Sequence, residues 1–190
     1  GGLKAQHLHA INALKEICNA ETNDIEIGSE ELHFKPNKIK RGIYEIDIGT
    51  AGSISLLLQA LILPSMFAPG KVTLKIKGGT CGKWQAPVDY LKNVLLPHLQ
   101  KFVEKIELKV QKRGYFPKGG GEISLEITPK IKLHDYKSFS SFQEELQSNI
   151  TKIELTEQGK LEQIRGNVNL SMELEDKDIG ERIKNSASGS

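Results

Sequence analysis

The first stretch of the chain carries an apolar stripe at helical spacing, which predicts a helix over residues 4–19. The stripe consists of His7, Ile11, Leu14 and Cys18. Two short apolar stretches then predict strands near residues 25–27 and 32–34, and strict alternation over residues 44–48 predicts a further strand with one buried face. A histidine at the head of an apolar stripe is, by itself, most simply a satisfied core or boundary residue.

The next segment is almost wholly apolar and predicts a helix that is buried on most sides. Ser53 is well placed as its N-cap, and Pro64 is expected to kink or end it. Gln59 stands among apolar neighbours on both sides. An unpaired buried amide costs about 1–3 kcal/mol, so we expect Gln59 to have a partner. A neighbouring backbone group would suffice.

Alternation over residues 72–77 predicts a half-exposed strand. Pro87 opens a helical stretch that should run to about residue 103, with a break or kink at Pro97. Strands are predicted over residues 106–112 and 122–128, joined by a glycine-rich turn. Strands that alternate with helices and end in a hairpin indicate an α/β (α+β) fold, in which layered sheets carry helices on one face.

After Pro129 the chain becomes polar, with Phe139 and Phe142 as its main apolar anchors. Strand-like pieces return near residues 153–155 and 168–174, and an amphipathic pattern begins at residue 178. We therefore expect a soft domain boundary near residues 160–170. Residues 1–165 form one part and residues 166–190 begin another.

The bulk composition is that of an ordinary folded protein. Hydrophobic residues make up 38% of the chain and charged residues 26%, and the net charge is +2. A nearly neutral chain does not by itself predict nucleic-acid binding, so such binding would need a local basic cluster. The candidate clusters are Lys35, Lys38, Lys40 and Arg41, and Lys112, Arg113 and Lys118.

The two cysteines, Cys18 and Cys81, are too few for a zinc site or a disulfide framework, and no other ligand spacing indicates a metal site. Free thiols are typical of a reducing compartment. The longest apolar run, residues 54–67, is too short to span a bilayer. We expect a cytoplasmic protein, or a nuclear one in a eukaryote, with no membrane partner. Self-association is left open.

The string Arg113-Gly-Tyr-Phe-Pro-Lys-Gly-Gly-Gly-Glu122 is the most distinctive motif. Successive glycines make sense where the backbone needs positive φ or a close approach. Exposed N–H groups flanked by Arg113 and Lys118 could form an anion-binding concavity. A plain hairpin with a bulged glycine turn explains the same string.

This string resembles the short signature of the RNA 3′-terminal phosphate cyclase family. Three further segments resemble that family in the same order. They are Gly2-Leu-Lys-Ala-Gln-His7, Asp47-Ile-Gly-Thr-Ala-Gly-Ser-Ile-Ser-Leu-Leu-Leu-Gln59, and Gly78-Gly-Thr followed by Ala86-Pro-Val-Asp89. The resemblance covers about residues 1–128. It implies a fold of repeated βαβαββ units, like that of enolpyruvyl transferases, with a small α/β insert domain beginning near residue 166.

The resemblance also implies roles for particular residues. Gln59, Gln6 and Pro87 are expected at the adenine nucleotide. His7 is expected to position substrate phosphates without being the nucleophile, and Lys4 to assist electrostatically at a helix N-terminus.

Three residues of the glycine signature are expected to contact RNA phosphate: Arg113, Lys118 and Gly120. Trp84 is a looser candidate, either to stack on a base or to cover the mouth of the pocket.

The implied chemistry is ATP-dependent conversion of an RNA 3′-terminal phosphate to a 2′,3′-cyclic phosphate, through histidine–AMP and RNA-adenylate intermediates. ATP is a substrate, Mg²⁺ or another divalent cation screens its triphosphate, and RNA 3′-phosphate ends are the partner. The family's N-terminal strand and its nucleophilic histidine match nothing in these residues. We therefore expect a partial, inactive chain. The alternative is a non-catalytic cyclase-like protein of pre-rRNA processing and ribosome biogenesis.

Overall fold

The computed structural model describes residues 1–83 and 85–189, and of residues 175 and 176 only the backbone. Trp84, a looser candidate for base stacking, lies outside the described residues. The chain divides into two compact units, Gly1–Ile153 and Glu154–Ser190. Whether the second unit is the start of an insert domain stays a prediction.

The first predicted helix is present as α1 (Ala5–Cys18). The two strands predicted after it are displaced: β1 (Glu21–Thr22) pairs antiparallel with β2 (Phe34–Lys35), and residues 25–27 form no strand. A side chain competes with strand pairing here, because Asn23 Oδ1 accepts a hydrogen bond from the His33 backbone N–H at 2.7 Å.

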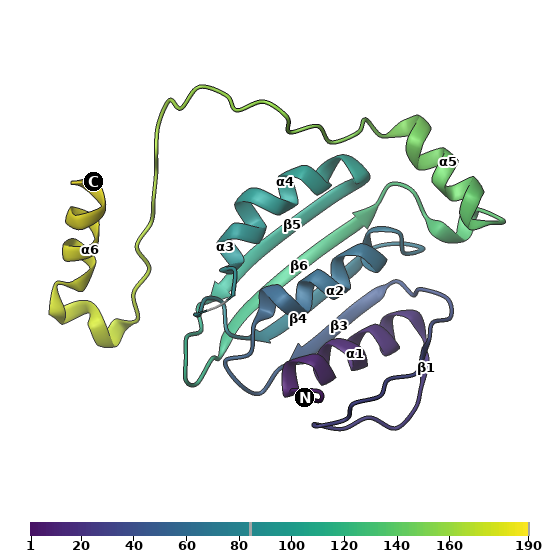
Figure 1. Cartoon of the computed structure of the whole chain (residues 1–190), viewed down its shortest axis with the longest axis horizontal. Coiled ribbons are helices and arrows are strands. Elements are labelled where there is room, and N and C mark those ends of the chain that lie inside the picture. Colours follow the sequence, from purple (N-terminus) through teal and green to yellow (C-terminus); the bar gives the residue numbers. More distant parts are fainter. Residues whose placement is uncertain (84, 190) are drawn as a thin grey trace. The chain divides into compact units, whose positions relative to one another are not determined.

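The main sheet has four strands in the order β3-β4-β6-β5. They are β3 (Gly42–Asp47), β4 (Val72–Gly78), β5 (Val103–Lys112) and β6 (Gly121–Pro129). β3 and β4 are parallel, connected through α2 (Ile54–Met66), and the other neighbours are antiparallel. Together with the helical segment before β5, these elements make one βαβαββ unit, as the α/β expectation requires (Figure 1).

α2 begins where the sequence predicts. The Ser53 hydroxyl accepts a hydrogen bond from the Leu56 backbone N–H at 3.2 Å, which is an N-cap. Pro64 does not end the helix, which continues two residues further to Met66. Because Pro64 lies in the last turn, its missing N–H removes a hydrogen bond only at the fraying end.

The helical stretch after Pro87 is continuous rather than broken. α3 (Val88–Tyr90) passes into a π-helical turn (Leu91–Leu95), then α4 (Leu96–Leu99) and a 3₁₀ turn (Gln100–Phe102). The wide turn lets the Leu96 N–H bond the Leu91 carbonyl, five residues back. The expected break at Pro97 is thus absorbed by a local widening of the helix.

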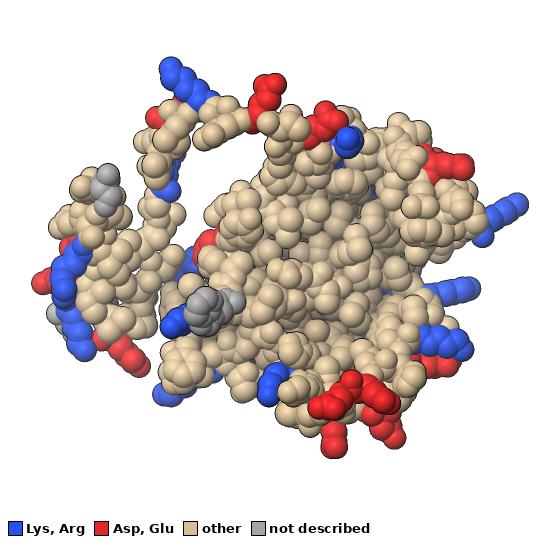
Figure 2. Space-filling model, in the orientation of Figure 1, with Lys and Arg blue, Asp and Glu red and all other residues tan. Residues whose placement is uncertain are grey.

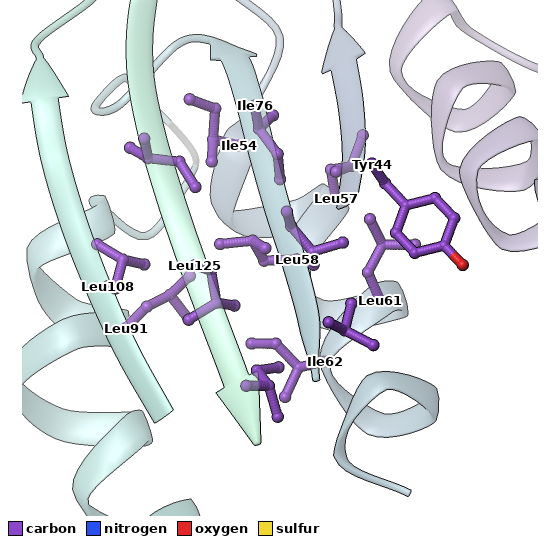
Figure 3. Close-up of a cluster of buried hydrophobic side chains, with 14 of the residues drawn as sticks. Tyr44, Ile54, Leu57, Leu58, Leu61, Ile62, Ile76, Leu91, Leu108 and Leu125 are labelled. Atoms are coloured by element: carbon purple, nitrogen blue, oxygen red, sulfur yellow. The ribbon is translucent and has the colours of Figure 1, made fainter. Parts of the chain in front are cut away.

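The core lies between the helices and one face of the sheet. Leu57, Leu58 and Leu61 of α2 point toward Ile76 of β4 and Leu125 of β6 (Figure 3). The opposite face of the sheet is polar and carries ion pairs. Most of these pairs are exposed, so each contributes little to the stability of the fold. These pairs are Lys75–Glu45, Lys71–Glu126, Lys77–Glu122, Lys105–Glu107 and Lys109–Glu107.

A helix that the sequence did not predict, α5 (Phe139–Asn149), follows the sheet. Its buried Phe142 packs edge-on against Phe67, with ring centroids 5.0 Å apart. The second unit holds a 3₁₀ stretch (Met172–Lys177) and α6 (Ile179–Ser188). The strand-like pieces predicted near 153–155 and 168–174 are not strands. Among the described residues, no helix is both long enough and apolar enough to cross a membrane.

Candidate functional site

Three loops and one helix start meet where the parallel strands β3 and β4 end. We call residues 4–7, 49–53, 79–83, 85–87 and 113–121 the loop cluster. The Gly79 N–H donates to the Gly52 carbonyl at 2.8 Å, and the Thr80 N–H donates to the Gly114 carbonyl at 2.9 Å. Open α/β sheets place ligands outside the carboxyl ends of their parallel strands, so the loop cluster is the expected place for a site.

Thr80 joins two of the loops. Its hydroxyl donates to the Gly114 carbonyl and accepts from the Gly114 N–H, both at 3.1 Å, and the side chain is buried. In the sequence, Thr80 stands out only as part of a glycine-rich segment. The sequence feature that could have predicted this bridging role is a hydroxyl side chain within a run of glycines.

The three glycines of the signature serve different purposes. Gly119 has φ +69°, and a Cβ there would lie 2.5 Å from the Thr50 carbonyl oxygen. Gly121 has no positive φ, but a Cβ would lie 2.6 Å from Thr80 Cγ2. Gly120 has φ +70°, and a Cβ there would meet nothing within 4 Å, so among the three it alone faces open space. Two of the three therefore allow close loop packing.

Gln6 connects α1 to α2. Its Oε1 accepts a hydrogen bond from the Ser53 backbone N–H at 3.0 Å, across a separation of 47 residues. This bond satisfies one of the N–H groups that a helix start leaves without an internal partner. Gln6 therefore joins two segments of the loop cluster and has a structural role there. Its expected contact with the nucleotide stays a prediction.

His7 is exposed, so the interpretation of a core histidine is wrong. Its Nδ1 accepts a hydrogen bond from the Lys4 backbone N–H at 3.1 Å. In the neutral ring this leaves the proton on Nε2, which becomes a hydrogen-bond donor. Lys4 is exposed beside it at the N-cap of α1.

Arg113 is held by Asp89 through two hydrogen bonds. Nη1 donates to Oδ2 at 2.6 Å and Nη2 donates to Oδ1 at 2.8 Å. The guanidinium holds the pKa of the Asp89 carboxyl below its usual range. Asp89 lies in the first turn of α3, so the pair ties the glycine signature to that helix. The RNA-phosphate role of Arg113 stays a prediction.

The expectation that Gln59 is buried is wrong, because it is exposed on the outward face of α2. Leu56 and Leu63 share that face and are 39% and 63% exposed. The segment is apolar all round, but only one side of it contacts the sheet. Pro87 is half-buried as the N-cap of α3. The nucleotide roles of both residues stay predictions.

A groove of about 370 Å³ runs along the loop cluster. It includes Gln6 but not His7, Gln59, Pro87 or Arg113. Its lining residues are Gln6, Ala51, Gly52, Ser53, Leu56, Gly82, Lys83, Gln85 and Phe116. Lys118 and Gly120 are exposed on the same loop as Phe116.

The loop cluster contains no aspartate or glutamate, although Asp47, just before it, accepts a hydrogen bond from the Gly49 N–H at 2.8 Å, and Asp89 is engaged by Arg113. Within the part of the chain that the structure describes, no group of three or more His, Cys, Asp or Glu side chains could hold a metal ion. The divalent cation that the resemblance implies would accompany the ATP phosphates, and it stays a prediction.

Comparison with known proteins identifies the family. The sequence model of the RNA 3′-terminal phosphate cyclases matches residues 1–152. A cyclase of Methanopyrus kandleri is 48% identical over 132 residues, or 70% of this chain and 38% of that protein. One of Archaeoglobus fulgidus is 48% identical over 128 residues, or 67% and 39%. One of Pyrococcus furiosus is 48% identical over 130 residues, or 68% and 38%.

The matched part of the chain thus covers less than two fifths of the length of these relatives, and the family match over residues 1–152 includes the whole loop cluster. The chain belongs to the RNA 3′-terminal phosphate cyclase family.

Proposed function

We propose that the protein containing this chain uses ATP to convert an RNA 3′-terminal phosphate into a 2′,3′-cyclic phosphate. The observation that carries the proposal is the family match over residues 1–152. The fold brings the family-like segments at Gln6, Gly52, Thr80 and Gly119 into one loop cluster. Segments far apart in sequence would converge in this way if they served one substrate site.

The chemistry has three steps. A histidine nitrogen outside these residues attacks the α-phosphorus of ATP, and pyrophosphate leaves. An oxygen of the RNA 3′-phosphate then attacks the phosphoramidate, and the histidine is released. Finally the adjacent 2′-OH attacks the 3′-phosphorus, AMP leaves as the P–O bond to the adenylate breaks, and the hydroxyl proton passes to a base. ATP enters accompanied by Mg²⁺ or another divalent cation.

Within this scheme the chain would orient phosphates. The Nε2–H of neutral His7 would donate a hydrogen bond to a phosphate oxygen, and Lys4 would add positive charge beside it. Gln6 would hold the start of α2 in place. These are positioning roles, since nothing assigns the nucleophile to His7.

Further contacts would come from the edges of the loop cluster. Gln59 and Pro87 would contact the adenine nucleotide. Lys118, the Gly120 backbone and the remaining N–H groups of Arg113 would contact RNA phosphate.

The deciding experiment uses the full-length gene product with α-labelled ATP and an RNA oligonucleotide ending in a 3′-phosphate. We expect an acid-labile, hydroxylamine-sensitive label on the protein, and a cyclic-phosphate product on the RNA. Residues 1–190 alone should form no label. If the full-length protein takes up no label with metal and ATP in excess, the cyclase proposal is wrong. The non-catalytic role in pre-rRNA processing would then be favoured.

A further inference from the structure

Positive charge is concentrated at the loop cluster although the chain as a whole is nearly neutral. The chain has 26 basic and 24 acidic residues, yet the loop cluster contains four basic residues and no acidic one. The basic residues are Arg113, which is paired with Asp89, and Lys4, Lys83 and Lys118, and the acidic residues Asp47 and Glu122 flank the cluster. Figure 2 shows basic side chains at the lower left of the first unit, and an acidic group beside them at its lower edge.

One aromatic ring stands at the edge of this basic surface. Phe116 is 84% exposed, the highest value among the large hydrophobic residues described in the first unit, and it lines the groove that contains Gln6. A single exposed apolar side chain is common on a protein surface, but this ring lines a groove beside a basic residue, Lys83, which makes it a candidate for contact with a ligand.

The loop that carries Phe116 is firmly held. The Gly119 N–H donates to the Tyr115 carbonyl at 2.7 Å, and Gly119 packs directly on Thr50. Thr80 fixes the start of the same loop through Gly114. The ring is therefore presented to solvent by a braced loop, which reduces the entropy lost when a ligand stacks on it.

We propose that Phe116 is a stacking platform for a base near the 3′ end of single-stranded RNA, and that Lys118 binds the adjacent phosphate. This inference rests on the proposed function and names the contact that holds the strand. An aromatic face combined with lysines is the usual composition of a single-strand site. A nucleotide pocket encloses most of its ligand, whereas an 84% exposed ring on a loop tip suits a strand that lies across the surface.

The test measures binding of the full-length protein to a fluorescent oligoribonucleotide with a 3′-phosphate, by anisotropy. Phe116→Ala should raise the Kd about tenfold, within the range that loss of one base stack produces. Phe116→Tyr, which keeps the ring, should bind as wild type does. Phe139→Ala removes an exposed ring on α5 and is the matched control.

A second arm uses oligonucleotides made abasic at each of the last three positions in turn. When the stacked base is the one removed, the Kd of the wild type should rise about tenfold. The Kd of Phe116→Ala should be the same for that abasic RNA as for intact RNA. The proposal is overturned if Phe116→Ala binds intact RNA as tightly as wild type does. It is also overturned if the wild type loses the same affinity at all three abasic positions, because a single stacked base predicts a loss at one. It is also overturned if the variant loses adenylylation in the absence of RNA, which would place the ring at adenine.

These outcomes separate the two proposals. A wild-type protein that is adenylylated and binds RNA, together with a Phe116→Ala variant of unchanged affinity, removes only the stacking platform. A wild-type protein that neither takes up label nor binds the 3′-phosphate RNA removes both. Because Phe116 is exposed, Phe116→Ala should retain the wild-type melting temperature, and that measurement shows that the variant is folded.

Discussion

Single residues of the glycine signature differ in what they contribute. Gly119 combines a positive φ with direct packing on Thr50, whereas Gly120 has a positive φ and open space around it. An L-residue in the left-handed region costs about 1–2 kcal/mol, and overpacking against rigid backbone costs about 1–3 kcal/mol more. Alanine substitutions at the two positions therefore separate the cost of the positive φ from the cost of the close packing.

We expect Gly120→Ala to lower the free energy of unfolding by about 1–2 kcal/mol and Gly119→Ala to lower it by about 2–5 kcal/mol. Urea denaturation of the full-length protein, followed by circular dichroism, provides the comparison. Equal losses at the two positions would show that the packing of Gly119 on Thr50 contributes nothing.

The Asp89–Arg113 pair makes stability depend on pH. The guanidinium lowers the pKa of Asp89 in the folded state, so the pair stabilises above the unfolded pKa of about 3.9. That contribution is lost as the pH falls through the lower, folded pKa. Asp89→Asn should therefore reduce the free energy of unfolding at pH 6, and the difference from wild type should shrink toward pH 2–3.

Denaturation curves at a series of pH values measure this difference. Asp24→Asn, at a site outside the loop cluster, controls for the loss of one carboxylate. If the free energy of unfolding differs between wild type and Asp89→Asn by the same amount from pH 6 to pH 2, the charged pair has no stabilising role.

At the scale of an element, α2 presents two different faces. Leu58 is fully buried against the sheet, whereas Gln59, the next residue, is exposed beside Leu56 and Leu63. Neighbouring positions on a helix point about 100° apart, so this contrast follows from the period of the helix. The sheet-facing side carries the stability, and the outward side is available for a ligand.

We expect Gln59→Ala to change the free energy of unfolding by no more than about 0.5 kcal/mol, and to weaken adenylylation of the full-length protein. Leu58→Ala should cost about 2–5 kcal/mol, since it opens a cavity in the core. Urea denaturation and labelling with α-labelled ATP are measured on both variants. A Gln59→Ala variant that labels as wild type does would remove Gln59 from the nucleotide site.

At the scale of the whole molecule, the two thiols should report on global folding. Cys18 is buried at the end of α1, its Sγ donates to the Leu14 carbonyl at 2.8 Å, and burial raises its pKa. Cys81 is partly exposed in the loop cluster. Thiols react as thiolates, so burial and a raised pKa both slow the reaction of Cys18.

In native buffer, iodoacetamide should therefore modify Cys81 before Cys18, and denaturant should make the two rates similar. Peptide mapping by mass spectrometry follows each residue separately. Equal rates in native buffer would mean that α1 opens readily from the sheet. Cys18→Ser is the control that identifies the slow site.

Periodicity predicted most elements of the first unit because apolar burial dictates it locally. α1 and strands β3 to β6 carry a period of 3.6 or 2, and α2 was predicted from its continuous apolar run. Prediction failed where local polar contacts compete with weak patterns, as at Asn23 before the expected strand at residues 25–27. It missed α5, whose main buried anchor is the single residue Phe142.

By itself, the sequence determined the family, through a string of residue types specific enough to be recognised, and the order of helices and strands from α1 to β6, through hydrophobic spacing. Only the tertiary structure decided which polar groups meet. Gln6 reaches Ser53, Thr80 reaches Gly114, and Asp89 reaches Arg113 through contacts between distant segments. Such partners depend on how the strands place their loops in space, and hydrophobic spacing along the chain carries no information about that placement.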